Sequence, residues 1–502
     1  MAQRLLCLLL CLVLLGGLLP PPASALISLE EERKMGEEAY AEVIAAIPLV
    51  DDPDIVDYVR NLAKRLEAYV PDKPFPFTVY VADVGQMNAF AIPGGYIFMY
   101  RGMMTALESE AELAGVLAHE MGHVWRRHIA KRIEKSKSTN LASIAGLLAG
   151  LVLGGMVSPA LGQALTMGSV AGGVQQQLAF SREDEQEADW AAFKTMTSAG
   201  YPPREMERSF QRIWKTEDYM GGNTPVYLRT HPTGPQRMEA MADMTRTWKG
   251  KPLHYDNSEF LRIQTRLIAL YDPEPQAEKL LTNRRLSDPN SPYPIYGLAL
   301  LNMRRHRYES ALQFLERLGK LWPDNVYQIR AEGVCRLLMG QDAKAEALLE
   351  RTLAKRPDDQ DTLLALGQAY QRQGRLNESV KVLRRLVAQD ETNQAALYEL
   401  GISLGRLGQV GEASLYLGLS FVQRHNYRSA QYHLSRAVNN LADKPELQAK
   451  AKQALEQMDV NARLKRKRQA KKEDEQRPSP FVNYDLDRPY TLPLIPAHPS
   501  GR

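Results

Sequence analysis

A repeat of 34 residues runs through the second half of the chain and restricts its fold more than any other feature. Three series of residues keep this spacing: Ala277, Ala311, Ala345, Ser379 and Ala413; Pro289, Pro323 and Pro357; and Gly333, Gly367 and Gly401. Small residues let paired helices approach closely, and a proline at a fixed place closes each unit. The period therefore predicts helix–turn–helix units that bury their apolar faces only by stacking on their neighbours. Ala430 follows Ala413 at half this spacing, which indicates that one helix serves two adjacent pairs.

The first half of the chain contains a motif that is typical of a metal site. In LAHEMGHVWRRH, which ends at His128, two histidines lie four residues apart. We predict one amphipathic helix from Glu108 to Lys135, on which His119 and His123 lie only about 40° apart around the axis and can reach one cation. Glu120 can hold a water molecule that this cation activates. Zinc hydrolases use this arrangement: the metal lowers the pKa of water towards about 7, and the glutamate takes the proton.

The residues that follow the motif do not complete the ligand set. A metzincin would have glycine three residues and histidine six residues after His123, but Arg126 and Ile129 stand there. His128 would lie about 140° from His123 around the helix and point away from the site. We interpret His128 as a supporting or surface histidine, so the third ligand must come from another segment.

The segment SREDEQEADW, which ends at Trp190, is the best source of a third ligand. Glu185 and Asp189 are four residues apart and share one face of a predicted second helix. One of them can bind the metal while the other forms a hydrogen bond to a ligand or to a reacting group. The neighbouring acidic residues point elsewhere. The alternative is a solvent-exposed acidic face, which the HExxH motif upstream makes less favoured.

The sequence before the motif predicts strands. PFPFTVYVADVGQMNAFAIPGGYIFMYRG alternates apolar and polar residues over two runs, and the turn between them is Pro93-Gly94-Gly95. An extended substrate peptide commonly pairs with an edge strand next to the zinc of a protease. We expect such a strand from Asn88 to Gly95, with Asn88, Ala89 and Phe90 as the residues next to the substrate.

Residues 1–25 have the form of a cleaved secretory signal peptide, because an arginine and an apolar run precede the small-residue site Ala23-Ser24-Ala25. An uncleaved membrane anchor is the alternative, but the apolar run is shorter than the about 20 residues of a span. Cys335 is then the one cysteine left, so a metal site must use His, Asp and Glu. The formal net charge of +4 gives no argument for a nucleic-acid partner.

A segment of 44 residues without a charged side chain, from Ser138 to Ser181, separates the two site segments. Buried helices or a lid near the site are favoured over a membrane-spanning hairpin, since glycine, alanine and Pro159 interrupt the apolar run. Peripheral contact of residues 138–181 with a membrane surface, or contact with an unfolded client, is a further hypothesis. After about Met458 the chain becomes charged and then proline-rich, which is typical of an extended tail.

HEMGH, SREDEQEAD and the preceding NAFAIPGGYIFMYRGMM together resemble the metallopeptidase family of the CaaX prenyl proteases and the HtpX-type proteases. The resemblance implies an α+β, gluzincin-like peptidase domain and one Zn²⁺ per chain, bound by His119, His123 and Glu185. It implies that Asp189 is a proton donor, whereas spacing alone would equally let Asp189 orient a histidine. The 34-residue period resembles the tetratricopeptide repeat, an all-α solenoid. We expect a signal peptide (1–25), a peptidase domain (26–255), the repeats (256–445) and a charged helix end with the tail (446–502).

LRTHPTGPQRMEAM contributes two further candidates, His231 and Arg237. Among the proteases that this chain resembles, a histidine in such a His-Pro stretch can take the fourth zinc position and displace the catalytic water. The resemblance therefore implies that His231 is a latch, and the alternative is a loop histidine near the site, because a catalytic zinc normally keeps its fourth position open. Arg237 is a candidate contact for a substrate carbonyl or an oxyanion.

The resemblance, the signal peptide and the repeats together imply a periplasmic zinc endopeptidase. Its expected partners are unfolded or stalled outer-membrane proteins, which it would degrade or help to assemble, and the outer-membrane β-barrel assembly machinery, with the repeats as the binding part. The alternative hypothesis is a repeat-based chaperone or adaptor in which the protease stays latched.

Overall fold

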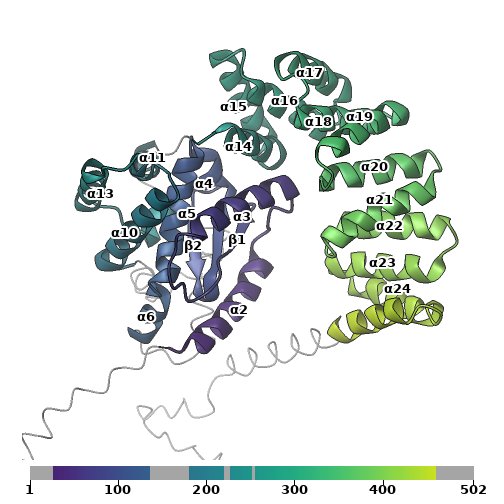
Figure 1. The fold of residues 1–502 in the computed structure, drawn as a ribbon, viewed down its shortest axis with the longest axis horizontal. Helices are drawn as coiled ribbons and strands as arrows, with labels where there is room; N and C mark the ends of the chain where they lie inside the picture. The colour runs from purple at the N-terminus through teal and green to yellow at the C-terminus, as the bar shows by residue number, and fades with distance from the viewer. Residues whose placement is uncertain (1–26, 136–179, 220–225, 252–254, 459–502) are drawn as a thin grey trace, which may run out of the picture. The chain divides into compact units, whose positions relative to one another are not determined.

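The computed structural model describes residues 27–135, 180–219, 226–251 and 255–458 (Figure 1). The predicted signal peptide, residues 138–179 of the charge-free segment and the tail after residue 458 lie outside the described residues. The chain divides into two compact units, residues 1–339 and 340–502. Within the parts of the chain that the structure describes, none of the helices is both long enough and apolar enough for a bilayer crossing.

The first unit is built on a three-stranded sheet with the strand order β1-β3-β2. Strand β1 (Thr78–Ala82) pairs in parallel with the central strand β3 (Tyr96–Tyr100), and β2 (Ala89–Ile92) pairs antiparallel with β3 as an edge strand. The predicted turn between β2 and β3 is present as the short helix η1 (Pro93–Gly95). The prediction of two strand runs was wrong, because the first run is interrupted after Ala82 and contains both β1 and β2.

Helix α5 (Glu110–Trp125) carries the HExxH motif and is buried from Glu110 to Val124. Its first turn is capped by Ser109, whose hydroxyl accepts a hydrogen bond from the Glu112 amide. Gly122, inside the motif, lies against α10 (Arg182–Ser198), where a side-chain β-carbon would come within 2.9 Å of the Ala188 carbonyl oxygen. The close approach of these two helices brings the acidic residues of α10 to the histidines of α5.

The predicted single helix from Glu108 to Lys135 is divided in two. Helix α5 ends at Trp125, Arg127 adopts a left-handed conformation (φ 56°), and α6 (His128–Lys135) begins after it. The Arg127 side chain pairs with Glu32 at 2.7 Å and also donates to the Ile27 carbonyl, so contacts with a distant segment hold the break. The ring of His128 therefore does not lie where a continuous helix would place it.

The other helices that precede the repeats pack around α5 and the sheet (Figure 1). Two helices stand before the first strand, and the second of them begins at Pro53, where the Asp52 side chain caps it. The helices that pack around α5 and the sheet are α2 (Leu29–Ala46), α3 (Pro53–Glu67), α4 (Arg101–Ala106), α11 (Pro203–Tyr219), α12 (Val226–Thr230) and α13 (Pro235–Thr247).

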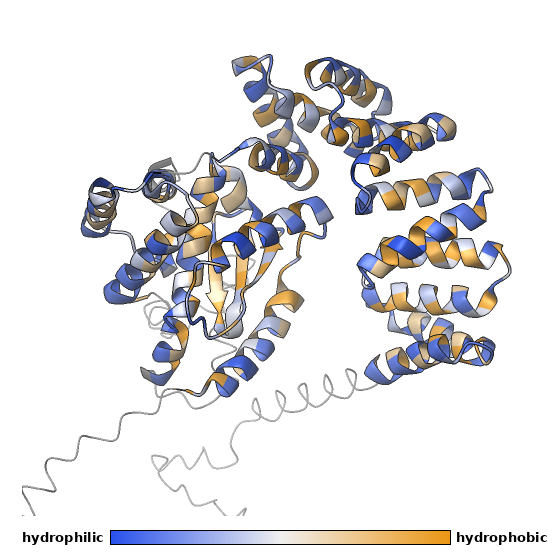
Figure 2. Ribbon diagram, in the orientation of Figure 1, coloured by the Kyte–Doolittle hydropathy of each residue, from blue (hydrophilic) through white to orange (hydrophobic). Residues whose placement is uncertain are grey.

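The second half of the chain consists of paired helices, as the 34-residue period predicts. The small residues at the repeated positions Ala277, Ala311, Ala345 and Ser379 are completely buried. Orange and blue residues alternate along these helices in Figure 2, in keeping with one apolar face each. The helices are α14 (Ser258–Tyr271), α15 (Glu274–Ser287), α16 (Pro292–Arg304), α17 (Tyr308–Leu321), α18 (Val326–Leu338), α19 (Asp342–Lys355), α20 (Gln360–Arg372), α21 (Leu376–Gln389), α22 (Gln394–Arg406), α23 (Val410–Gln423) and α24 (Tyr427–Asn440).

Helix α14 belongs to two hydrophobic cores of the first unit. Phe260, Ile263 and Leu267 pack into the core around the sheet and α5, whereas Ile268 and Ala269 pack into the core of the first repeats. The side-chain amide of Gln264 donates to the backbone carbonyls of Met104 and Leu107, next to the start of α5. Helix α14 thus joins the two cores within the first unit, and the domain boundary near residue 255 stays a prediction.

Candidate metal centre

Helices α5 and α10 bring together three of the predicted ligands. The Nε2 atoms of His119 and His123 are 3.0 Å apart. Glu185 lies opposite them, with Oε2 3.5 Å from His119 Nε2 and Oε1 3.6 Å from His123 Nε2. All three side chains are buried. Their convergence on one point fits a cation as the common partner of two imidazole nitrogens and one carboxylate.

A fourth residue with a ligand-type side chain lies in the same group. His231 follows the short helix α12, and its Nδ1 is 3.0 Å from Glu185 Oε1 and 3.4 Å from His119 Nε2. One ligand atom from each of His119, His123, Glu185 and His231 lies within 4.8 Å of the others. The His231 ring stacks on Tyr227 with a centroid separation of 4.5 Å. Three histidines and one glutamate thus form a buried set with metal-site geometry.

Glu120 lies beside this set without a partner of its own. Both carboxylate oxygens are buried, and neither has a hydrogen-bond partner among the described residues. His231 Nε2 lies 3.7 Å from Glu120 Oε1. A buried carboxylate with unused acceptor atoms next to a metal-type cluster suits the binding of a water molecule and the uptake of its proton.

Asp189 and Arg237 form a chain of contacts that ends on His119. Asp189 Oδ1 is 3.0 Å from His119 Nδ1, on the ring side opposite the cluster. The Arg237 guanidinium holds Asp189 with two bonds, of 2.6 Å from Nε and 2.7 Å from Nη2, and pairs with Glu185 through Nη1. The guanidinium also lies over the Phe210 ring. Arg237 therefore already has Glu185 and Asp189 of α10 as partners.

Burial and charge shift the pKa values of the clustered groups. Burial opposes the charged form of His119, but hydrogen bonds with Asp189 and Glu185 outweigh burial and raise the pKa of His119 to about 9. Burial and the neighbouring His119 hold the pKa of His123 well below its ordinary value. Burial alone would raise the pKa of Glu185, yet Arg237 and His231 hold it well below its usual range. A metal ion that binds here must displace the proton favoured on His119.

Two further residues contact His123: His128, for which the sequence left a supporting role open, and Phe180, which the sequence did not place in the site. His128 is completely buried, with Nδ1 3.0 Å from His123 Nδ1, so the prediction that it points away was wrong. The broken helix at Arg127 is the physical reason. Phe180 stacks on the His123 ring at a centroid separation of 3.9 Å, and its amide donates to the Thr230 carbonyl beside His231. No local sequence signal identifies either contact, since both depend on pairs of distant segments.

The predicted substrate strand lies beside the motif helix. Ala89 and Phe90 belong to the edge strand β2, and Asn88 precedes it. The strand packs against α5. Asn88 is buried, and its side-chain oxygen has no hydrogen-bond partner in the described structure.

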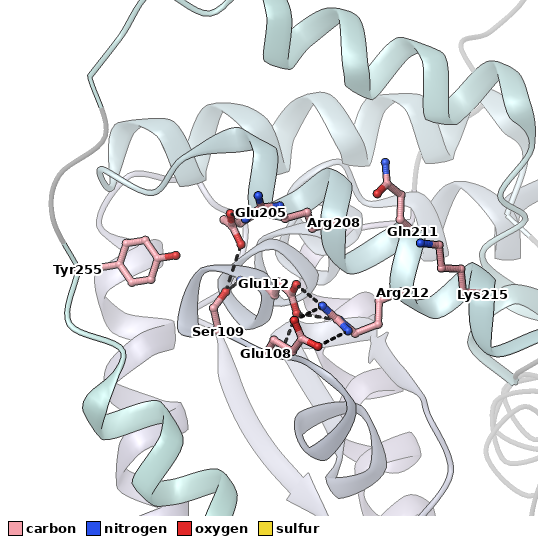
Figure 3. A pocket seen from close by; sticks show the side chains of 9 residues that line it. All are labelled: Glu108, Ser109, Glu112, Glu205, Arg208, Gln211, Arg212, Lys215 and Tyr255. Atoms are coloured by element: carbon pink, nitrogen blue, oxygen red, sulfur yellow. Dashed lines mark hydrogen bonds and ion pairs between the residues drawn. The ribbon is translucent and has the colours of Figure 1, made fainter. Parts of the chain in front are cut away.

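A cleft of about 590 Å³ lies at the other end of α5, away from the metal-type cluster (Figure 3). Three acidic and three basic side chains line it, and most of them are paired: Arg212 contacts Glu108 and Glu112, and Glu205 also accepts a hydrogen bond from Ser109. Glu205 also pairs with Arg208. The cleft thus offers no excess of charge of either sign, and we assign no site to it.

Comparison with known proteins places the cluster inside a recognised domain. Residues 50–245 match the model of peptidase family M48, and residues 336–400 match a tetratricopeptide-repeat model. The chain is 28% identical to a β-barrel assembly-enhancing protease of Yersinia pestis over 355 residues, which cover 69% of this chain and 72% of that protein. The corresponding Escherichia coli protein is 26% identical, with coverage of 66% and 71%. The metalloprotease LoiP of E. coli is 27% identical over 235 residues, which cover 45% of this chain and 87% of that protein.

Proposed function

We propose that the metal of this metalloendopeptidase is zinc and that the protein acts on unfolded or stalled outer-membrane proteins in the periplasm. Residues 50–245 match peptidase family M48, and tetratricopeptide repeats follow this domain. The observation that carries the proposal is the buried group of His119, His123, Glu185 and His231, whose ligand atoms lie within 4.8 Å of one another. The remaining observations support the roles of single residues.

His119, His123 and Glu185 would hold the zinc ion, because two imidazole nitrogens and one carboxylate are the ligand set of many catalytic zinc sites. The two Nε2 atoms and the Glu185 carboxylate face one point from two rigid helices. When bound there, zinc would supply a Lewis acid that polarises the scissile carbonyl and eases deprotonation of the attacking water.

Glu120 is the proposed general base. Its buried and unpartnered carboxylate can accept the proton of the attacking water and deliver that proton to the nitrogen of the leaving amine. The position of Glu120 beside the ligands, and not among them, separates its role from theirs.

Asp189 and Arg237 are proposed to position the ligands. Asp189 Oδ1 accepts the hydrogen of His119 Nδ1, which leaves Nε2 with its lone pair towards the cluster. The same geometry favours the orienting role for Asp189 over the role of proton donor that the family resemblance implies. Arg237 is bound to both Asp189 and Glu185 in the structure, so a contact with substrate would require it to exchange a partner.

His231 is proposed to take the fourth zinc position in a resting state. Its Nδ1 lies within hydrogen-bonding distance of Glu185, and its side chain is buried. A fourth protein ligand excludes the attacking water, as in closed structural zinc sites, so the peptidase would be latched until His231 moves. This feature is also the observation that favours the second candidate function, a repeat-based chaperone or adaptor whose protease stays closed.

The substrate and the compartment are proposed from three features. The relatives in Yersinia pestis and E. coli are named β-barrel assembly-enhancing proteases, residues 1–25 have the form of a signal peptide, and the repeats provide stacked helix pairs of a kind that binds proteins. We propose that the repeats bind the client or the outer-membrane assembly machinery. An extended client would add to the sheet along β2, next to Asn88, Ala89 and Phe90.

The proposal is tested with the purified mature protein and its Glu120→Gln and Glu185→Gln variants. Metal content by plasma emission spectroscopy and cleavage of unfolded casein are measured on the same samples. Glu120→Gln should keep about one zinc per chain and lose cleavage, because it removes the base and leaves the ligands. Glu185→Gln should lose both. Normal cleavage by Glu120→Gln, or a wild-type protein without zinc, would refute the proposed mechanism.

A further inference from the structure

A break in the motif helix brings a further histidine, His128, into contact with the cluster. Arg127 has a left-handed backbone (φ 56°), and the chain re-enters a helix at His128. The His128 ring is completely buried and meets the His123 ring at a centroid separation of 5.0 Å. A histidine buried in this way between two helices needs partners for both ring nitrogens, and both partners are present.

The direction of each hydrogen bond follows from the proposed ligand role of His123. Its Nε2 faces His119 and Glu185, so Nε2 must keep its lone pair for the metal and the ring hydrogen must lie on Nδ1. That hydrogen is donated to His128 Nδ1 at 3.0 Å. His128 Nδ1 is then an acceptor, so the His128 hydrogen lies on Nε2.

The series of hydrogen bonds that starts at His123 ends at the carboxylate of Glu187 on α10. His128 Nε2 lies 3.0 Å from Glu187 Oε2, to which it donates. The same Glu187 oxygen also lies 3.4 Å from Lys131 Nζ. The carboxylate fixes the tautomer of His128, and His128 in turn fixes the tautomer of His123.

We propose that His128 is a positioning residue that, with Glu187, fixes the ring orientation and the tautomer of His123 for metal binding. The arrangement matches the contact of Arg237 and Asp189 with His119 on the other side of the cluster. The Nδ1 atom of each HExxH histidine, which faces away from the proposed metal, thus contacts its own pair of polar side chains: Asp189 and Arg237 for His119, and His128 and Glu187 for His123. The inference rests on the proposed function, since it assigns a partner to one of the proposed ligands.

The test compares His128→Asn, His128→Leu, Glu187→Gln and Glu183→Gln. Zinc affinity is measured by competition with a chromophoric chelator, and the absorption spectrum of the Co²⁺-substituted protein reports ligand geometry. Asparagine can place an acceptor oxygen near the position of His128 Nδ1, whereas leucine fills a similar volume without an acceptor. Glu183 lies on the exposed first turn of α10, so Glu183→Gln removes the same charge without a contact to His128.

His128→Leu should weaken zinc binding by about 10- to 100-fold and alter the Co²⁺ spectrum, because loss of an outer partner has effects of this size. His128→Asn should restore most of the affinity, Glu187→Gln should weaken binding less than His128→Leu, and Glu183→Gln should have no effect. Thermal unfolding of the metal-free variants checks that each is folded.

Two results would overturn the inference. Wild-type affinity and spectrum in a folded His128→Leu variant would mean that His123 needs no partner. Equal weakening in His128→Asn and His128→Leu would mean that His128 acts by packing alone. Absence of zinc binding in the wild-type protein would instead refute the proposed function itself, so the two failures are distinguishable.

Discussion

His231 differs from the other ligand-type residues in the element that carries it. His119, His123 and Glu185 come from two long helices, whereas His231 follows α12, a helix of only five residues. Its local supports are the stack on Tyr227 and the hydrogen bond from its amide to the Tyr227 carbonyl. At the scale of the residue, His231 is the member of the group that can leave without breaking a long helix.

His231→Ala should therefore make the purified protein more active on casein than the wild type, while zinc content stays near one per chain. The three remaining ligands hold the metal and leave one position for water. If His231 instead stabilised the transition state, the same change should lower the cleavage rate by about 10²- to 10³-fold. The sign of the change in rate, with zinc measured on the same sample, decides between the two roles.

Asp189→Ala should weaken zinc binding less than Glu185→Ala does. Asp189 contacts a ligand from outside the group, and the loss of such a partner typically costs about 10- to 100-fold in affinity, whereas Glu185 is a proposed ligand. Chelator competition measures both affinities. Equal and undiminished zinc affinity in the two variants would place the third ligand elsewhere.

At the scale of single residues, the sequence predicted the contacts that follow from the spacing of residues along a helix. The four-residue spacing of His119 and His123, and of Glu185 and Asp189, places each pair on one face of a helix, and the structure brings the two faces together. The position of His128 was not predictable in this way. A left-handed arginine is unfavourable by about 1–2 kcal/mol, and here contacts with Glu32 and Ile27, about a hundred residues away, maintain it.

At the scale of the element, a left-handed glycine follows each of the repeat helices α18, α20 and α22. Gly340, Gly374 and Gly408 keep the 34-residue period and have φ angles of 77°, 77° and 78° in the turns between helices. The sequence period predicted the helices and their small buried residues, because these positions repeat. The strands were predicted less well, since the short runs around Ala82 carry no period long enough to separate β1 from β2.

Gly374→Ala should destabilise the second unit by about 1 kcal/mol, because an alanine is strained at this φ angle. A β-carbon at residue 374 would meet nothing within 4 Å, so the backbone conformation is the one expected cause. Gly405→Ala is the matched control: it lies inside α22, and its β-carbon would be 3.7 Å from Ala413, an ordinary contact. The control should be neutral or stabilising in urea unfolding, and an equal loss in both variants would contradict the argument.

At the scale of the whole molecule, buried ion pairs join the sheet-containing core to the first repeats within the first unit. Asp54 on α3 pairs with Arg262 on α14 at 2.9 Å and also with Arg330 on α18. Burial alone would raise the pKa of Asp54, but Arg330 and Arg262 hold it far below its ordinary value. These pairs connect residues more than 200 positions apart, which a reading of local sequence could not foresee.

Asp54→Asn should lower the free energy of unfolding at pH 7 by about 3–5 kcal/mol, because it leaves buried arginines without their counter-charge. The pKa of Asp54 is depressed in the folded state, so its contribution is fully present above the unfolded value near 4 and declines as the pH falls below it. The difference between wild type and variant in urea unfolding should therefore shrink from pH 7 to pH 3. A difference that does not change with pH would mean that packing, and not charge, is lost.

A fragment that ends at residue 339 should fold and bind zinc, whereas a fragment that ends at residue 257 should not. The longer fragment keeps α14, whose Phe260, Ile263 and Leu267 complete the core around α5. The shorter one lacks these side chains and leaves Asp54 without Arg262. Circular dichroism and zinc content of both fragments provide the measurement. A stable, zinc-binding fragment 27–257 would show that the predicted boundary near residue 255 is a true domain limit.

The shared helix α14 also sets an order of events during synthesis. Ribosomes deliver the chain from its N-terminus, so both motif histidines and Glu185 are made long before Leu267, the last member of the core that surrounds them. Until that residue is available, the nascent chain lacks the apolar side chains that α14 adds to this core, and a ribosome that stops before α14 releases an incomplete core with exposed apolar side chains. The peptidase core is therefore completed only after its own sequence has been made and the first repeat helix has followed it, so a chain cut short just after the metal-ligand segments has the motifs without the complete core.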